Sequence, residues 1–298
     1  ILEAAIILFS SFFAMIFSQR MRTILQSFPM IRAGDYGYKI ELSGSDELAT
    51  LANEFTKLTD KLADAEASRR RFVSDASHEL KTPLASIKLL AETMLQNELD
   101  TETQREFIGD IASEAERLNR MTQKLLQLTK MDSIREESDR EVIVLGYVAE
   151  KVSRMLAPLA EERGITLSLR VDLECSILAP EDDIYQILFN LVENGIKYNV
   201  DGGSVEIIGH LQDEDVHLTV ADTGVGIPED AREHIFERFY RVDKARSREA
   251  GGAGLGLSIV HDMVERNYGT ISVAAREGGG TKFVLVFPYF GVETEVQP

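Results

Sequence analysis

Apolar residues recur at alternating intervals of three and four positions through the segment 73–94. The residues of this stripe are Val73, Ala76, Leu80, Pro83, Ile87, Leu90 and Met94. Such spacing is that of a coiled-coil seam, so the segment must fold as a helix that buries one stripe against other helices. With Val73 at position a of the heptad, His78 falls at f, the position farthest from the seam. Thr82 follows one turn later, so both side chains lie on one solvent-facing strip.

A histidine on such a strip is open to a partner that must reach it, react with it and leave. Glu79 is its neighbour in sequence and can orient the imidazole or accept its proton. Pro83 removes one backbone hydrogen bond from the same helix and predicts a bend beside the reactive turn. Taken alone, a histidine on a helix is better explained as a solvated surface residue, and it is the surrounding pattern that favours the reactive interpretation of His78.

The N-terminal residues 1–17 are almost wholly apolar, and Arg20 and Arg22 follow directly. This pattern predicts the end of a membrane span with its C-terminal side in the cytoplasm, and we assign residues 1–18 to it. We expect the remainder of the span, and any external sensing domain, to precede residue 1. A buried core helix is the alternative interpretation.

Two further helical stripes flank a connector at residues 34–46. The first stripe consists of Met21, Ile24, Leu25, Phe28 and Ile31, and the second of Leu48, Leu51, Phe55, Leu58 and Leu62. Two short helices bury little surface alone, so we expect them to pair with a second copy in a four-helix coil. Farther along, Phe72, Ala76 and Leu80 are separated by two consecutive steps of four, a stutter that locally unwinds a left-handed coil.

The helix that carries His78 is expected to end near Gln96, and Thr101 with Gln104 predicts a capping box at the start of the next helix. That next helix has a single apolar face formed by Ile108, Ile111, Ala115, Leu118, Thr122 and Leu125. Two antiparallel helices with one apolar face each are half of a four-helix bundle, so a homodimer is expected. A polar linker is expected from Met131 to Asp139.

From about residue 141 the pattern changes to alternating strands and helices. Strands are expected at 142–145, 165–171, 175–178, 204–210, 216–221, 270–275 and 281–287, and helices at 146–163, 181–198 and 255–267. This order predicts a two-layer α+β sandwich. Cys175 is the only cysteine, which excludes an intrachain disulfide and favours a small buried thiol.

The charge of the chain excludes one class of partner. Lysine and arginine number 32 against 50 aspartate and glutamate residues, and the formal net charge is −18. Nonspecific nucleic-acid binding needs a basic surface, so no nucleic-acid partner is expected.

Two motifs in the C-terminal half have the chemistry of a nucleotide site. Asn190, Asn194 and Lys197 fall on one face of a helix, where amide oxygens can hold Mg²⁺ and an ammonium can bind phosphate. A polar outer helix face is the alternative. The segment from Asp222 to Pro228 offers a carboxylate that can accept a hydrogen bond from an exocyclic amine such as that of adenine. Its glycines let the backbone approach a flat ring, although a lone Gly-x-Gly usually marks only a turn.

Two more motifs can bind phosphate. The segment Phe236–Arg241 contains arginines that can reach phosphate oxygens, although Phe236 itself is better explained by packing on the core. The glycine-rich segment 251–256 leads into a helix, where free backbone amides attract anions. It lacks the Gly-Lys-Ser/Thr of a P-loop, which disfavours Walker-type ATPases. The polar segment 242–250 between these motifs is a candidate lid over the phosphates.

In this order and spacing the four motifs resemble the N, G1, F and G2 boxes of the GHKL (Bergerat) ATPase fold. The segment around His78 resembles the phosphoacceptor box of sensor histidine kinases, and residues 19–65 resemble a HAMP relay module. The chain is therefore similar to a transmembrane sensor histidine kinase of two-component systems. Its all-α dimeric stalk would end with dimerisation and phosphoacceptor helices at 66–134. The α+β catalytic domain would cover 138–291, followed by a tail at 292–298.

The resemblance implies ATP and Mg²⁺ as the bound groups, with Asn194 as the principal metal ligand and Asn190 as its support. It also implies that Asp222 contacts adenine and that Lys197 and Arg241 contact phosphates. Further nucleotide contacts are expected from Tyr198, Gly224, Gly226, Gly252, Gly254, Leu255 and Gly256. Ala253 departs from the family, which often has Ser or Thr there, and removes one possible hydroxyl contact.

The resemblance further implies autophosphorylation of His78, with Glu79 as base, and transfer to an aspartate of a response-regulator receiver domain. Glu79 and Thr82 match the family's phosphatase pattern, in which Thr82 positions a water against the phosphorylated regulator. Such a protein would sit in a bacterial cell membrane with its catalytic region in the cytoplasm. Two rivals are another GHKL ATPase, such as a chaperone or DNA-repair clamp, and a GHKL nucleotide-binding scaffold that never transfers phosphate.

Overall fold

The computed structural model describes residues 2–37, 39–40, 42, 44, 46–131, 140–242 and 254–291. Contacts between residues divide the chain into two compact units, Ile1–His78 and Glu79–Pro298. The expected linker at 132–139 and most of the expected lid and tail lie outside the described residues.

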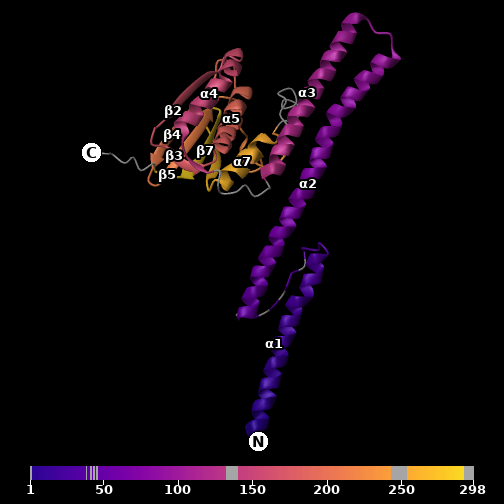
Figure 1. The fold of residues 1–298 in the computed structure, drawn as a ribbon, viewed down its shortest axis with the longest axis vertical. Helices are drawn as coiled ribbons and strands as arrows, with labels where there is room; N and C mark the ends of the chain where they lie inside the picture. Colours follow the sequence, from indigo (N-terminus) through magenta and orange to yellow (C-terminus); the bar gives the residue numbers. More distant parts are fainter. Residues whose placement is uncertain are drawn as a thin grey trace, which may run out of the picture. The chain divides into compact units, whose positions relative to one another are not determined.

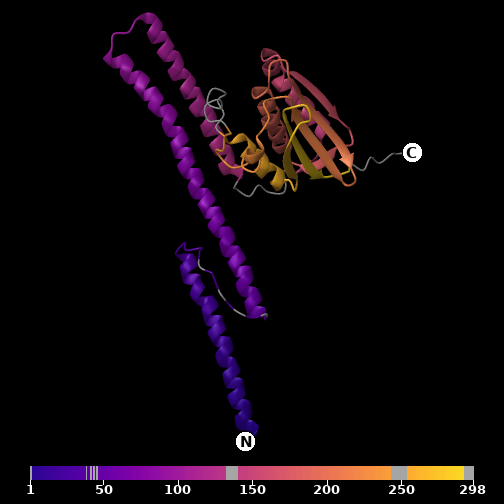
Figure 2. The ribbon, with the colours of Figure 1, turned by 180° about the vertical axis from the view of Figure 1, so that it is seen from behind.

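The first unit is a pair of helices joined by a short connector. Helix α1 (Leu2–Arg32) is 31 residues long, and α2 (Glu47–Gln96) begins after the connector and runs in the same direction (Figures 1 and 2). The helices and connector share a small apolar cluster of Ile24, Ile40 and Ala52, packed against Leu42, Leu48 and Phe55. Asp46 begins α2, because its Oδ1 accepts the backbone N–H of Ala49 at 3.0 Å, and the same carboxylate binds the guanidinium of Arg20.

Helix α1 is long and apolar enough to cross a membrane. An 18-residue window within it has a mean hydropathy of 1.7 and is not buried against any other described part of the chain. These properties of length and composition agree with the predicted span but are weak evidence by themselves, since signal sequences share them.

In the second unit, α2 continues through Pro83 to Gln96 and α3 (Thr101–Met131) returns antiparallel to it (Figure 1). The predicted capping box at Thr101 is wrong. Asp100 caps α3 instead, accepting the backbone N–H groups of Glu102 and Thr103 on Oδ1, each at 3.0 Å. Gln104 donates to the carbonyl of Leu99 at 3.2 Å rather than accepting a hydrogen bond. The physical reason is that an ionised carboxylate one position earlier is a stronger acceptor than the threonine hydroxyl.

The rest of the second unit is a mixed sheet covered by three helices. The five-stranded sheet has the order β2-β4-β5-β7-β6, in which β2 is parallel to β4 and the other neighbours are antiparallel. The bounds of these strands are Thr166–Val171 for β2, Ser204–Gln212 for β4, Asp215–Asp222 for β5, Thr270–Ala275 for β6 and Thr281–Pro288 for β7. Strands β1 (Glu141–Val144) and β3 (Ser176–Ala179) form a separate antiparallel pair.

Helices α4 (Leu145–Glu162), α5 (Glu181–Lys197) and α7 (Gly256–Arg266) stack against one face of the sheet (Figure 1). Every second residue of the central strands is apolar and points at these helices, so Val205, Leu218 and Leu285 are fully buried. This arrangement confirms the predicted two-layer α+β sandwich. Cys175 is also fully buried, and burial raises the pKa of its thiol, as expected for an unreactive core cysteine.

Candidate functional site

One polar face of α5 meets the first residue of α7. Asn190 is 3% exposed and Asn194, one turn later, is half-buried. A Cβ placed at Gly256 would lie 3.5 Å from Asn190 Oδ1 and 4.0 Å from Asn194 Nδ2. The two amides therefore lie beside the N-terminus of α7, in van der Waals reach of a side chain at position 256.

The N-terminus of α7 and the adjacent Asn190 have the donors that a phosphate requires. The first backbone N–H groups of an α-helix have no partner within the helix, and its dipole favours negative charge there. Asn190 Nδ2 is buried and has no hydrogen-bond partner among the described residues. A buried donor without a partner costs stability unless a ligand satisfies it, so the residues present fit a polyphosphate.

The polar face of α5 also offers ligands to a metal ion. Within the described ranges no group of three or more His, Cys, Asp or Glu side chains is arranged to hold one. A Mg²⁺ ion here would therefore be held by amide oxygens, of which Asn194 offers the more accessible, together with phosphate oxygens and water. The roles of Asn190 and Asn194 as metal ligands stay predictions.

Asp222 ends β5 with a carboxylate that is only partly used. Its Oδ1 accepts the backbone N–H groups of Gly224 at 2.8 Å and Thr281 at 3.2 Å. Across the described part of the chain Asp222 Oδ2 has no hydrogen-bond donor, so it can accept an amine. Burial raises the pKa of this carboxyl group, while the two backbone bonds and the charge of Arg276 act in the opposite direction.

Glycines allow the backbone to close around Asp222. A Cβ at Gly224 would overlap the carbonyl oxygen of Tyr198 and lie 2.9 Å from Asp222 Oδ1. A Cβ at Gly280 would overlap the carbonyl oxygen of Asp222 itself. These two positions can be occupied only by glycine without moving the backbone that carries the carboxylate. Gly226 lies in the left-handed region at φ 74° and completes the turn.

Thr281 and Arg276 belong to this site, although the sequence pattern assigns neither of them an interaction with Asp222. The only signal is the glycine run that precedes β7, and it says nothing of Asp222. The contact between Thr281 and Asp222 joins residues 59 positions apart, which only the pairing of β5 with β7 brings together.

The third and fourth motifs meet at their ends. Phe239 N donates to the carbonyl oxygen of Gly254 at 2.8 Å, and a Cβ at Gly254 would lie 2.8 Å from the carbonyl carbon of Phe239. Phe239 has a positive φ of 64°, a conformation that is rare for a bulky residue. Leu255 is fully buried just before α7. Gly252 and Ala253 lie outside the described residues.

The two predicted phosphate-binding cations contact carboxylates. Lys197 Nζ lies 2.9 Å from Glu193 Oε1 on the same helix. Arg241 Nη1 lies 3.9 Å from Glu79 Oε2, and its side chain is 5% exposed. Each cation would have to exchange a carboxylate for a phosphate, so both assignments stay predictions. Tyr198 is half-buried, and its carbonyl accepts the N–H of Val225 at 3.1 Å.

The residues of the predicted phosphoacceptor strip are exposed as the heptad analysis expects. His78 and Thr82 are both exposed on α2, whereas Ala76 and Pro83 are buried on the opposite stripe. Glu79 is half-buried. The strip therefore presents an imidazole and a hydroxyl to solvent one turn apart.

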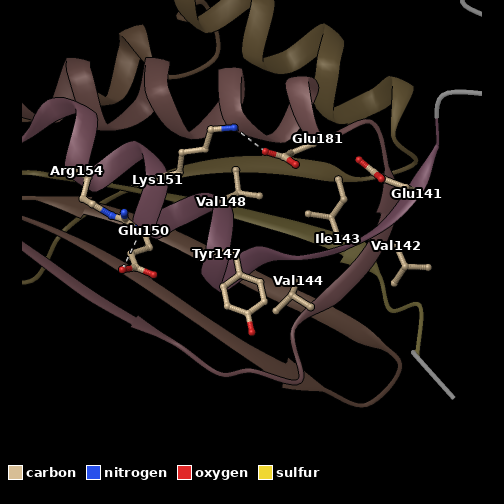
Figure 3. A pocket seen from close by; sticks show the side chains of 10 residues that line it. All are labelled: Glu141, Val142, Ile143, Val144, Tyr147, Val148, Glu150, Lys151, Arg154 and Glu181. Atoms are coloured by element: carbon tan, nitrogen blue, oxygen red, sulfur yellow. Dashed lines mark hydrogen bonds and ion pairs between the residues drawn. The ribbon is translucent and has the colours of Figure 1, made fainter. Parts of the chain in front are cut away.

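A separate groove of about 620 Å³ lies between β1 and the first turns of α4 (Figure 3). Its lining includes none of the predicted site residues. Its cations are already paired, Lys151 with Glu181 at 2.8 Å and Arg154 with Glu150 at 3.1 Å (Figure 3). The groove therefore offers a phosphate fewer unpaired donors than the start of α7 with Asn190 does.

Two family models match the chain. Residues 68–134 match the His Kinase A (phospho-acceptor) domain, and residues 179–290 match the histidine kinase-, DNA gyrase B-, and HSP90-like ATPase. The first range contains His78, and the second contains all four nucleotide motifs.

Curated relatives of the chain are named as sensor or sensor-like histidine kinases. Sensor histidine kinase YclK of Bacillus subtilis is 33% identical over 278 residues, which cover 91% of this chain and 59% of that protein. Sensor-like histidine kinase SenX3 of Mycobacterium tuberculosis is 36% identical over 245 residues, covering 82% of this chain and 60% of that protein. The chain thus spans well under two thirds of the length of these curated relatives.

Solved structures agree with the fold. Full-length ShkA in complex with AMPPNP aligns with a TM-score of 0.55 and 28% identity, covering 74% of this chain and 46% of that one. Histidine kinase ThkA in complex with response regulator protein TrrA aligns with a TM-score of 0.61 and 24% identity, covering 77% of this chain and 66% of that one.

Proposed function

The chain belongs to the sensor histidine kinases of two-component systems, and from that premise we propose that it phosphorylates its own His78 with ATP. The phosphoryl group would then pass to an aspartate of a response-regulator receiver domain. The observation that carries this proposal is the buried Nδ2 of Asn190 beside the N-terminus of α7, which has no hydrogen-bond partner among the described residues. This Nδ2 group and the first N–H groups of α7 supply hydrogen-bond donors for a polyphosphate. The same chain also has an exposed histidine, His78.

The nucleotide would be held at two points. Asp222 Oδ2 accepts a hydrogen bond from the exocyclic amine of adenine, and Gly224 and Gly280 keep the surrounding backbone close enough for the ring to pack. The phosphates lie against the first turn of α7 and Asn190. Asn194 would be the principal protein ligand of Mg²⁺, which when bound offsets charge on the phosphate oxygens.

Phosphoryl transfer needs alignment and charge neutralisation more than covalent help from the protein. One nitrogen of neutral His78 attacks the γ-phosphorus in line, the bond to the bridging oxygen breaks, and ADP leaves. Glu79 accepts a hydrogen bond from the other ring nitrogen, which favours the reactive tautomer, and takes that proton as the phosphohistidine forms. Lys197 and Arg241 would release Glu193 and Glu79 to reach phosphate oxygens.

The same helix supports the reverse activity toward the regulator. Thr82 shares the exposed strip with His78 and has a hydroxyl that can orient a water against a phosphoaspartate. The half-bundle of α2 and α3 supports a homodimer, and α1 supports an anchor in the cell membrane with the catalytic region in the cytoplasm. We extend the proposal to the domain boundaries 1–18, 19–65, 66–134, 138–291 and 292–298.

Labelling of the full chain in detergent micelles with γ-labelled ATP tests the kinase activity. We expect an acid-labile, base-stable label that is lost in His78→Gln, while ATP binding is retained. His234→Gln is the matched control, because His234 is an exposed imidazole that pairs with Glu237 at 2.7 Å and has no proposed role. Label that persists in His78→Gln would contradict the assignment of the acceptor.

The rival scaffold function predicts a different result. A scaffold binds ATP and acquires no label in the wild-type chain. Asp222→Asn should abolish ATP binding under either function, so it tests the site separately from the transfer. Thr82→Ala should lower the rate at which a phosphorylated regulator loses its phosphate and leave labelling of His78 unchanged.

A further inference from the structure

Two histidines face each other across adjacent strands at the end of the sheet farthest from Asp222. His210 on β4 and His217 on β5 are direct partners in the antiparallel ladder. Their ring centroids are 5.4 Å apart and the ring planes differ by 16°. Directly opposite side chains are the nearest neighbours that a sheet offers, so the two imidazoles form a pair fixed by the backbone register.

The pair lies on the face of the sheet that the helices leave uncovered. Val216 and Leu218, which flank His217 in the strand, point toward the helices and are fully buried. His210 is exposed and His217 is half-buried, because successive side chains alternate between the two faces. A small ion can therefore reach both rings from solvent.

Neither imidazole is already committed to another group. Within the described ranges, neither His210 nor His217 forms an ion pair or a side-chain hydrogen bond. The other two histidines of the catalytic domain differ in this respect. Nδ1 of the exposed His234 lies 2.7 Å from Glu237 Oε1, and Nδ1 of the half-buried His261 lies 3.7 Å from Glu265 Oε2. In its neutral form each imidazole has one ring nitrogen with a lone pair for a ligand, and rotation about the side-chain bonds turns the two near-parallel rings toward a common ion.

We propose that His210 and His217 together bind one divalent transition-metal ion of the class Zn²⁺, Ni²⁺ or Cu²⁺, through one nitrogen of each ring. Imidazole is a preferred ligand of these ions, whereas Mg²⁺ and Ca²⁺ prefer oxygen. No third His, Cys, Asp or Glu completes a cluster among the described residues, so water fills the remaining positions. The site is open and of moderate affinity, and it is distinct from the Mg²⁺ site proposed at Asn194.

The position of the pair separates its role from nucleotide binding. His217 is near the start of β5 and Asp222 is its last residue. An ion on the pair links β4 to β5, and because it binds the folded sheet it raises the thermal midpoint of the chain. It leaves the contacts of Asp222 with Gly224 and Thr281 unchanged.

Titration of the nucleotide-free full chain in detergent micelles with copper(II) chloride and, separately, zinc chloride tests the proposal. Electron paramagnetic resonance of the chain with one equivalent of Cu²⁺ should show two equatorial imidazole nitrogens. The affinity for Zn²⁺, measured by calorimetry, should fall by at least about tenfold in His210→Gln and in His217→Gln, since loss of even an outer partner of a metal ligand costs that much.

His234→Gln is the control and should keep the wild-type affinity and spectrum. His210 is exposed and makes no side-chain hydrogen bond, so His210→Gln should fold normally, which retained ATP binding verifies. The proposal is overturned if His210→Gln binds Zn²⁺ as tightly as the wild type, or if His234→Gln loses as much affinity. Its failure would leave the kinase function untouched, because the two tests share no residue of the nucleotide site.

Discussion

Burial of Asp222 makes adenine recognition depend on pH. Only the ionised carboxylate can accept the exocyclic amine on its free oxygen, and burial raises the pKa of this group above its ordinary value. ATP affinity should therefore fall on acidification, and it should fall at a higher pH than an exposed aspartate with a pKa of about 3.9 would require. The measurement is the dissociation constant of ATP as a function of pH.

The charge of Arg276 provides a test of the direction of this pH effect. Its positive charge favours ionised Asp222, so Arg276→Gln removes a stabilising charge and should move the midpoint of the pH profile upward. Lys282→Gln is a suitable comparison, because Lys282 is an exposed cation on β7 and is not among the groups that shift the pKa of Asp222. An identical profile in wild type and Arg276→Gln would show that the guanidinium does not act on the carboxylate.

Gly280 and Gly278 separate backbone strain from steric overlap. Both have positive φ, 100° and 88°, so alanine at either position is strained by about 1–2 kcal/mol. A Cβ at Gly278 meets nothing within 4 Å, whereas a Cβ at Gly280 overlaps the Asp222 carbonyl and lies 2.8 Å from Thr223 Cα. Urea denaturation should thus show a larger loss of unfolding free energy for Gly280→Ala. ATP affinity should fall in that variant alone, and equal losses would contradict this packing.

The start of α3 depends on Asp100 rather than on Thr101. Asp100→Ala leaves the N–H groups of Glu102 and Thr103 without their acceptor and should lower the thermal midpoint, whereas Thr101→Ala should not. The pKa of Asp100 is lowered, chiefly by the Thr103 backbone hydrogen bond. The cap therefore stabilises the helix at neutral pH and fails as the pH falls through that lowered value. Equal midpoints for the two variants at neutral pH would contradict the assignment of the cap to Asp100.

Local sequence patterns predict helices and strands, but they do not predict contacts between residues that are distant in the sequence. The periodicity of three and four residues is a property of neighbours, so α5 with Asn190 and Asn194 on one face could be predicted from the sequence. The exposure of His78 follows from its heptad position for the same reason. By contrast, the bond from Thr281 to Asp222 and the contact of Phe239 with Gly254 depend on how separate strands and turns fold together. No local spacing encodes them.

Competition between neighbouring polar groups determines the cap of α3 and the partner of Lys197 in the structure. Thr101 and Gln104 fit the spacing of a capping box, but Asp100 has the stronger acceptor and occupies the amides first. Lys197 fits a phosphate ligand by position, yet it pairs with Glu193 when no phosphate competes. In both cases the residue type suggests a partner, and its actual partner is the strongest oppositely charged or polar group within reach.

Helix α2 joins the predicted relay and phosphoacceptor segments without interruption, over 50 residues. Its stutter at Phe72, Ala76 and Leu80 breaks the regular heptad phase between the two segments. Around this point the side chains of Arg69 and Arg70 are exposed and both bind Glu66, at 3.0 and 3.1 Å. The helix is therefore stabilised here by ion pairs between its own side chains, and we expect it to tolerate added residues.

Insertions after Arg69 should change signalling according to helical phase. Each added residue rotates everything beyond it by about 100°, so one or two residues turn His78 far from its original direction, while three or four nearly restore it. We expect the ratio of His78 labelling to regulator dephosphorylation to shift most with one or two residues, and least with the seven-residue control that restores the heptad. The thermal midpoint should stay nearly constant, because the insertion lengthens an exposed helix. Equal ratios across the series would mean that the stutter does not couple the rotation of the relay segment to the reactive turn.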